Sequence, residues 1–282
     1  MGVVKNLVVV TWNGGDEVPY SHVHFDLERN FDLLLFNNTG KPGEIERHNG
    51  VMYDHYIIEK TENKGQIFFH LCQYLSKNNL EYNYVGVIDD DIIFKVSDFN
   101  YMLHIANIHG LDVFQPSIAK DSYFSHRRFV HRPGQMVTNI DWVEIMAPFY
   151  SQAVFNAAGP YLTKSISGTG TDAYLIPTIQ QLIGKTKTAV IHGVSMKHCR
   201  PIRTGNRTFS NNKTCMQEIH EMQVFCKNLY RNALESKDLN NNFIKSVLNR
   251  EFINGIPLKH KLARIIPMFK NIYKLLVDAS YR

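Results

Sequence analysis

The sequence predicts an α/β fold in which helices pack on a layered, mostly parallel central sheet. Two observations carry this prediction. Short segments that are apolar almost throughout, as expected of strands buried on both faces, recur along the first 200 residues. Segments with apolar residues at helical spacing lie between them. The 282 residues are 44% hydrophobic and 20% charged, a composition typical of a globular chain with a substantial core.

The expected elements alternate along the chain. The first three strands and the helix before the third are predicted at residues 3–11, 31–36, 84–88 and 65–78. After them we expect a helix to about 108, a strand at 112–116, a polar loop at 120–139, a strand at 142–150, helices at 152–163 and 172–183, and a strand at 188–192. Beyond residue 212 the chain is predicted to be helical, at about 215–235, 239–251 and 258–277. We therefore expect a catalytic domain over 1–212 and a helical extension over 213–282.

Positive charge is concentrated at the end of the chain. Residues 245–282 carry a net charge of +6, whereas the preceding residues carry −1. A near-neutral body argues against a nucleic-acid groove. Residues 259–277 also place apolar side chains on one helical stripe, with most of the lysines and arginines off it. The basic extension is expected either to pack on the domain or to dock on an anionic membrane surface.

The beginning of the chain and its cysteines bear on location. Residues 1–10 contain no charged and then apolar leader, so no signal peptide is expected. The four cysteines form no CxxC pair, which favours reduced thiols over a disulfide framework or a zinc site. We expect a cytoplasmic protein, or one bound peripherally to the inner face of the membrane.

Three consecutive carboxylates, Asp89, Asp90 and Asp91, follow the apolar strand at 84–88. Adjacent carboxylates repel one another unless a cation compensates them, and carboxylate oxygens at the end of a strand suit Mg²⁺ or Mn²⁺. Asp89 and Asp91 can converge on one ion, and a neutral imidazole from His192 or His198 can complete the site. The alternative is a solvated acidic turn.

A second group of polar residues is the segment Ser-Gly-Thr-Gly-Thr-Asp at 167–172, which leads into a predicted helix. Its two glycines permit a tight backbone approach, and Asp172 would be held at the start of the helix. Asp172 can therefore act as a general base. The alternative interpretation is an ordinary helix cap.

Basic side chains occur at two further places. Lys64 and Gly65 begin the helix that precedes the acidic triplet, where a phosphate could bind. Arg127, Arg128 and Arg132 crowd the loop at 120–139 and could neutralise a diphosphate. In both places a solvated basic surface is the alternative.

The order of these pieces resembles the GT-A-fold glycosyltransferases. The resemblance covers about residues 3–205 and rests on Ile88-Asp89-Asp90-Asp91, the segment 143–148, Gly170-Thr171-Asp172 and the segment 194–198. Through residues 144–150 the chain looks most like a little-characterised branch of that family. The resemblance implies a Rossmann-type layered fold in which the triplet is the DXD motif. It also implies that a divalent ion, Mn²⁺ or Mg²⁺, is held on the diphosphate of a nucleotide-sugar.

Roles for individual residues follow from the resemblance. It implies Asp89, Asp91 and His198 as metal ligands and Asp172 as the base of an inverting hexosyltransferase. The residues expected to contact the donor are Thr11, Lys64, Asp89, Asp90, Arg127, Arg128, Arg132 and Glu144. The expected acceptor is a glycan or a lipid-linked saccharide, as in polysaccharide biosynthesis. A metal-dependent phosphoester hydrolase and a non-catalytic membrane-docking module are the alternative functions.

Overall fold

The computed structural model describes residues 5–13, 22–41, 53–201, 207–234, 243 and 247–249, and the backbone of 252–253 and 256–257. The strands are β1 (Leu7–Trp12), β2 (Val23–His24), β3 (Asp32–Asn37), β4 (His55–Ile58), β5 (Tyr84–Ile88), β6 (Ile92–Lys95), β7 (Val113–Ile118), β8 (Val137–Asn139), β9 (Phe149–Ser151), β10 (Thr188–His198), β11 (Phe252–Ile253) and β12 (Ile256–Pro257). The α-helices are α1 (Lys64–Lys77), α2 (Val96–His109), α3 (Gln152–Ala158), α4 (Ile176–Ile183) and α5 (Cys215–Leu234).

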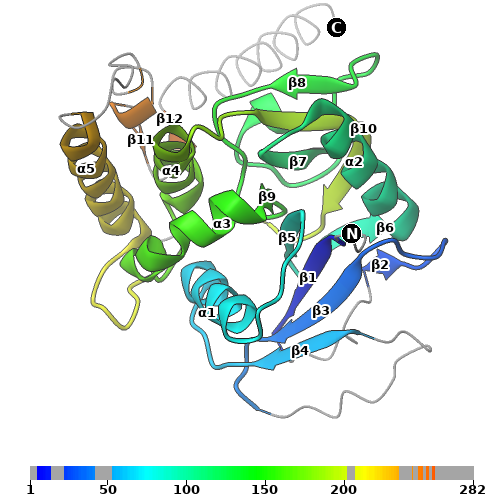
Figure 1. The fold of residues 1–282 in the computed structure, drawn as a ribbon, viewed down its shortest axis with the longest axis horizontal. Coiled ribbons are helices and arrows are strands. Elements are labelled where there is room, and N and C mark those ends of the chain that lie inside the picture. Colours follow the sequence, from blue (N-terminus) through cyan, green and yellow to red (C-terminus); the bar gives the residue numbers. More distant parts are fainter. Residues whose placement is uncertain are drawn as a thin grey trace, which may run out of the picture.

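The described strands before β11 form one mixed sheet in the order β2-β6-β10-β7-β9-β5-β1-β3-β4, with β8 paired to β10 (Figure 1). Strand β1 is parallel to both of its neighbours, so that Val9 lies opposite Leu34 of β3 and Val87 of β5. Strands β3 and β4 continue this parallel arrangement. The carboxyl ends of β1, β3 and β5 therefore meet at one edge of the sheet, the edge at which α/β folds place ligands.

Strand β10 organises the other half of the sheet. It runs parallel to β7 and antiparallel to β6 and β8. Its register against β7 shifts between Ile191 and Ser195, after which its last residues pair with the beginning of β6. Strand β9 is antiparallel to both β5 and β7 and joins the two halves.

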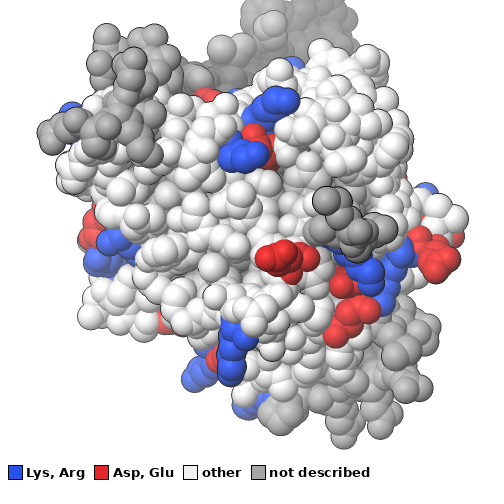
Figure 2. Space-filling model, in the orientation of Figure 1, with Lys and Arg blue, Asp and Glu red and all other residues white. Residues whose placement is uncertain are grey.

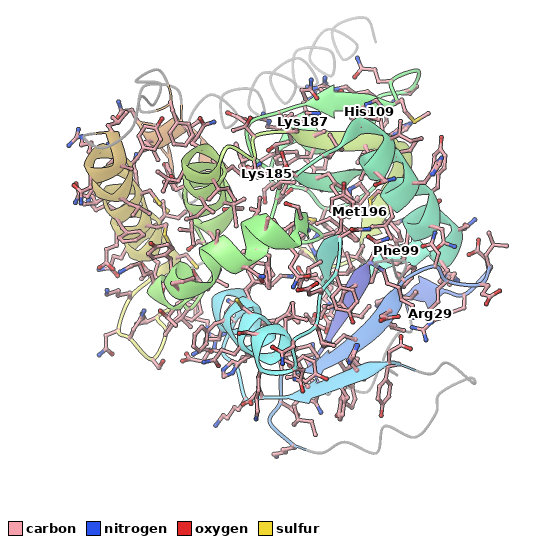
Figure 3. The ribbon with its side chains drawn as sticks, in the orientation of Figure 1. Arg29, Phe99, His109, Lys185, Lys187 and Met196 are labelled. Atoms are coloured by element: carbon pink, nitrogen blue, oxygen red, sulfur yellow. The ribbon has the colours of Figure 1, made fainter. Side chains whose placement is uncertain are left out.

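Helices cover the sheet through apolar side chains at the expected spacing. In α1 the buried side chains include Phe68, which packs edge-on against Tyr150 of β9 with ring centroids 6.1 Å apart. Helix α2 contacts β6 and β10, and both Phe99 of α2 and Met196 of β10 are fully buried (Figure 3). Helix α5 packs against α4 (Figure 1). The expected α/β fold with a mostly parallel sheet is confirmed.

Several predicted elements differ in detail. The predicted strand at 142–150 is wrong except for its end, because only β9 is a regular strand, while the mostly buried residues 142–148 contact the end of β5 through single backbone hydrogen bonds at Met146 and Pro148. The predicted loop at 120–139 contains a 3₁₀ turn and the short strand β8. The predicted helix at 152–163 changes to a 3₁₀ helix at Gly159–Lys164, where Pro160 has no N–H to donate. Strand β10 continues to His198, well past the predicted end at 192.

The predicted helices at 239–251 and 258–277 lie outside the described residues, apart from the few positions given above. Within the described part of the chain, no helix is long and apolar enough to span a bilayer. On the face seen in Figure 2, acidic and basic side chains form small mixed patches separated by broad uncharged surface. The described residues on that face form no continuous basic stripe of the kind that binds nucleic acid.

Candidate active site

The acidic triplet lies at the edge where the parallel strands end. Strand β5 is buried along its whole length and ends at Ile88. The backbone N–H of Asp89 then donates to the carbonyl oxygen of Met146 at 3.1 Å, and the N–H of Ile92 donates to the carbonyl of Asp89 at 3.2 Å. This turn directs the chain into β6. The three carboxylates are therefore held in a fixed turn between two strands.

Each carboxylate of the triplet lies beside a basic side chain, and Arg200 lies near both Asp90 and Asp91. The ammonium group of Lys64 contacts Asp89, and Arg200 contacts Asp90 at 3.2 Å. The imidazole Nε2 of His198 lies 3.1 Å from Oδ2 of Asp91. These partners come from the start of α1, from the end of β10 and from the segment that follows it. The repulsion expected within the triplet is thus offset by the surrounding protein.

The surroundings shift the pKa values of the three groups in different directions. Burial raises the pKa of Asp89 in spite of the nearby Lys64, and burial also raises the pKa of Asp90 in spite of Arg200. Burial acts on Asp91 in the same direction, but its hydrogen bond with His198 and the charges of His198 and Arg200 outweigh burial and lower its pKa. Asp91 is therefore the carboxylate of the triplet held most firmly in its ionised form.

His198 reaches the triplet because of strand register. In the antiparallel pairing of β10 with β6, His198 lies opposite Ile92, the residue directly after Asp91. Its Nδ1 lies 3.1 Å from the carbonyl oxygen of Tyr123, which can only accept a hydrogen bond. Nδ1–H therefore donates to that carbonyl, and Nε2 faces Asp91. A ring N–H bonded to a carbonyl is the usual way in which a metal-binding imidazole is oriented.

His192, the other histidine proposed from the sequence, lies elsewhere. It precedes His198 by six positions on β10, at the register shift between Ile191 and Ser195. Its Nε2 lies 3.1 Å from the hydroxyl of Thr138, and its ring is 6.1 Å from that of His131. Burial, with the positive charges of Arg132 and His131, lowers its pKa to about 4. His192 therefore belongs to a separate group of side chains around β8.

The expected ligands are only partly assembled. Asp91 and His198 are in contact, whereas Asp89 is engaged by Lys64. Among the residues that the structure describes, no three His, Cys, Asp or Glu side chains are close enough together to form a metal centre. One observation does fit a cation at this point: Oδ1 of Asp91 is buried and has no hydrogen-bond partner among the described atoms. The predicted ligand set Asp89, Asp91 and His198 stays a prediction.

The start of α1 connects the triplet to the glycine-containing segment. Lys64 is buried, and Gly65 packs so closely on that segment that a Cβ atom would lie 1.7 Å from the carbonyl oxygen of Ser165. The N–H of Gly65 donates to Ile166 at 3.1 Å. Gly168, at φ +78°, occupies a conformation that favours glycine and lies against Lys64 and Gly65. Two stretches about 100 residues apart in sequence thus form one unit beside the triplet.

Asp172 follows this unit and lies in a single π-helical turn over Thr171–Leu175, directly before α4. Its Oδ1 accepts the N–H of Ala173 at 2.8 Å. Burial raises the pKa of Asp172 to about 6, although hydrogen bonds from backbone N–H groups, including that of Ile145, act in the opposite direction. The carbonyl oxygen of Met146, the residue after Ile145, accepts the N–H of Asp89. The segment around Ile145 and Met146 therefore connects Asp172 with the triplet.

Asp172 lines a small cavity of about 60 Å³. Its walls include His126 and Trp142, whose rings pack edge-on with centroids 4.8 Å apart, together with Ile145 and Ile219. The indole N–H of Trp142 is buried without a hydrogen-bond partner among the described atoms. Neither His126 nor Trp142 was predicted as a site residue, because neither lies in a recognisable motif. Aromatic rings and a carboxylate thus lie side by side in this cavity.

The other residues predicted to contact a donor lie in different surroundings. Arg128 is held by Asp141 at 2.5 Å and lies over the Trp142 ring at 5.7 Å, while Arg127 and Arg132 are exposed. Thr11 and Glu144 are buried, at 4% and 5% exposure. The contacts of these residues with a donor stay predictions.

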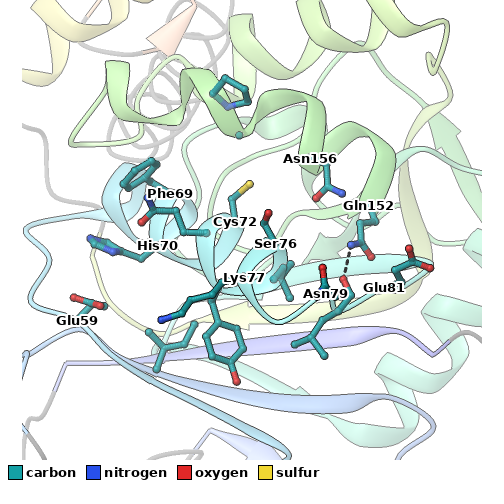
Figure 4. A pocket seen from close by; sticks show the side chains of 17 residues that line it. Glu59, Phe69, His70, Cys72, Ser76, Lys77, Asn79, Glu81, Gln152 and Asn156 are labelled. Atoms are coloured by element: carbon teal, nitrogen blue, oxygen red, sulfur yellow. Dashed lines mark hydrogen bonds between the residues drawn. The ribbon is translucent and has the colours of Figure 1, made fainter.

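A larger groove, of about 970 Å³, lies on the outer side of α1 (Figure 4). Residues of α1 and α3, including His70, Cys72 and Asn156, line it. None of the residues predicted for the active site lines this groove. It is therefore a separate surface feature, and the chemistry described above lies outside it.

Comparisons with known proteins identify the fold. The 1–349 portion of TarS from S. aureus in complex with UDP-GlcNAc matches at a TM-score of 0.54 and 10% identity, over 79% of this chain and 65% of that one. The same portion in complex with UDP matches at 0.51 and 9%, over 86% and 75%. A longer TarS chain matches at 0.53 and 8%, over 79% and 39%. The chain has a GT-A-type fold. No protein-family model and no curated protein matches the sequence.

Proposed function

We propose that this protein is a metal-dependent glycosyltransferase that transfers a sugar from a nucleotide-diphosphate donor to a glycan or a lipid-linked saccharide. The observation that carries the proposal is that one segment, Ile145 and Met146, contacts both Asp172 and the triplet in which Asp91 meets His198. The GT-A-type fold supports it, because similar structures were solved with UDP-GlcNAc and with UDP. Uridine-diphosphate sugars are therefore the first donors to test.

Asp172 is proposed as the base. A carboxylate whose pKa is raised to about 6 is mostly ionised at pH 7 and is still basic enough to accept a proton from an acceptor hydroxyl. Apolar and aromatic side chains in the cavity wall limit the access of water. Attack by the hydroxyl on the anomeric carbon, opposite to the leaving diphosphate, gives inversion of configuration.

Asp91 and His198 are proposed to hold the divalent ion. The buried, unpartnered Oδ1 of Asp91 and the orientation of His198 fit such an ion. When bound, Mn²⁺ or Mg²⁺ neutralises negative charge on the leaving diphosphate. Lys64 balances the charge of Asp89. The exposed Arg127 and Arg132 are further candidates for contact with phosphate oxygens.

The decisive experiment is a thermal-shift panel of nucleotide-sugars, measured with and without Mn²⁺. A ligand that binds only the folded protein must raise its apparent stability, by about 2.7 kcal/mol at a hundredfold excess over Kd. A shift with one nucleotide-sugar that requires the metal is the expected result. If no nucleotide-sugar shifts the transition under either condition, the proposed activity is wrong.

We also propose a cytoplasmic location with the basic residues 245–282 docked on the anionic inner face of a membrane. The supporting observation is their net charge of +6 beside a near-neutral body, with each basic side chain near the surface contributing about 1 kcal/mol. The full chain should co-sediment with anionic vesicles at low salt and be released at high salt. Undiminished co-sedimentation after truncation at about Ile256 would exclude the extension as the docking element.

A further inference from the structure

Glu218, in the first turn of α5, is a buried carboxylate that receives hydrogen bonds from the segment preceding Asp172. Its side chain has no exposure to solvent. Oε2 accepts the hydroxyl of Ser165 at 3.0 Å and the N–H of Ser167 at 2.9 Å, and the Ser167 hydroxyl also contacts it. Oε1 accepts the N–H of Ile166 at 2.9 Å and the side-chain amide of Asn211 at 2.8 Å. These five donor contacts fill the acceptor capacity of the carboxylate.

These hydrogen bonds keep Glu218 charged. Burial acts to raise the pKa of the carboxyl, but the donors from Ser167, Ile166 and Asn211 outweigh burial and lower it. A buried carboxylate that accepts several N–H and O–H groups is strongly favoured in its ionised form. The position therefore needs a side chain with two acceptor oxygens and a negative charge.

The segment is held from two sides. Opposite Glu218, the N–H of Gly65 donates to the carbonyl of Ile166, and Gly168 lies against α1. At its end, Gly170 packs so closely on α5 that a Cβ atom would lie 3.0 Å from Cβ of Met222. Asp172 comes two residues later, and Ile219, the neighbour of Glu218, lines its cavity. The orientation of Asp172 thus depends on a segment clamped between α1 and α5.

We propose that Glu218 is a positioning residue for Asp172: through residues 165–167 it fixes the turn that presents Asp172 to the acceptor. This inference rests on the proposed function, in which Asp172 is the base. A base displaced by about 1 Å can lose about 10²-fold in rate without any change in the affinity for the donor. Within the described part of the chain, the hydrogen-bond partners of Glu218 include none of the residues proposed to bind the metal ion or the donor.

The test compares Glu218→Gln with Glu221→Gln in the full chain. Glutamine keeps the shape of Glu218 but places an N–H₂ group among donors. Glu221 lies on the same helix and pairs with Lys213 at the surface. Hydrogen exchange at the amides of Ile166 and Ser167 is measured together with kcat and the Kd for UDP. In Glu218→Gln we expect exchange to be about 10-fold faster, kcat about 10- to 100-fold lower and Kd unchanged within about threefold.

Two further variants keep the test decisive. Glu218→Asp retains the charge and should recover part of kcat. Ser165→Ala removes one donor to Glu218 while leaving the carboxylate in place, so it reports on the contact if Glu218→Gln does not fold. The inference is overturned if the wild type is active and Glu218→Gln has the same kcat. It is also overturned if Glu221→Gln lowers kcat as much as Glu218→Gln does. If the proposed function itself is wrong, wild type and Asp172→Asn will be equally without transfer activity. Hydrogen exchange at Ile166 and Ser167 will still show how firmly Glu218 holds residues 165–167.

Discussion

Replacement of Asp172 by Asn should abolish transfer and yet stabilise the protein at neutral pH. The pKa of Asp172 is raised from 3.8 to about 6 by burial, which corresponds to about 3 kcal/mol between the folded and unfolded states. Because the folded protein binds this proton more tightly, the contribution of Asp172 to stability is most favourable below pH 4 and is lost as the pH rises through 6. Above pH 6 the ionised, buried carboxylate lowers the free energy of unfolding by the full ~3 kcal/mol.

Asparagine removes the charge but also part of the hydrogen bonding. An amide has one acceptor oxygen, so one backbone donor such as the N–H of Ala173 loses its partner at a cost of about 1 kcal/mol. The variant should therefore be about 2 kcal/mol more stable than wild type at pH 7 and about 1 kcal/mol less stable at pH 4. Transfer should fall by about 10²- to 10⁴-fold, with binding of the donor retained.

Urea unfolding at pH 4, 5, 6 and 7 measures the stability difference, and a coupled assay for released nucleotide measures transfer. Asp121→Asn is the control, because Asp121 is exposed and paired with Lys197, so its neutralisation should give no gain at pH 7. A stability difference for Asp172→Asn that does not change with pH would refute the argument from burial. Near-normal transfer would leave Asp172 as a structural residue only.

Three further changes test the neighbouring contacts. Asp91→Asn should abolish Mn²⁺-dependent binding of a nucleotide-sugar in calorimetry with little loss of fold, and an unchanged dependence on Mn²⁺ would show that the metal binds elsewhere. Gly65→Ala should destabilise the protein by about 1–3 kcal/mol in urea unfolding, because its Cβ would meet the carbonyl of Ser165, and wild-type stability would contradict the close packing. Lys64→Met should cost about 3–5 kcal/mol in the same assay by leaving the Asp89 charge without its ammonium partner, and a smaller loss would mean that solvent or Asp89 protonation compensates.

The elements that were predicted well are those whose apolar residues follow one simple pattern along the whole element. Strand β5 and helix α1 lie where expected, because a run buried on both faces and a stripe of apolar residues each leave a clear pattern. The segment 142–148 was mistaken for a strand for the same reason. Trp142 is buried by edge-on contacts with Phe129 and His126 rather than by strand pairing, and an apolar run does not distinguish the two.

The candidate site was predictable only where its residues follow strands. Asp91 and His198 each stand at a strand boundary, and the structure brings them together. Lys64 was interpreted as a phosphate ligand, but its ammonium contacts Asp89 in the described structure. The contacts of Glu218 could not be predicted, because it is more than 50 residues from the serines that it binds and belongs to an otherwise ordinary helix.

The pairing of β10 with β6 makes the position of the His198 side chain depend on the number of residues at the end of β10 more than on their identity. Because side chains alternate along a strand, one residue added or removed between Ser195 and His198 would turn the imidazole to the opposite face of the sheet, away from Asp91. Substitutions at Ser195 or Lys197 leave the backbone pairing in place. Related chains that preserve the contact should therefore vary in sequence at Ser195 and Lys197, but not at the buried Met196, while sharing the length of this stretch, with any insertion confined to the irregular turn that follows Ile191.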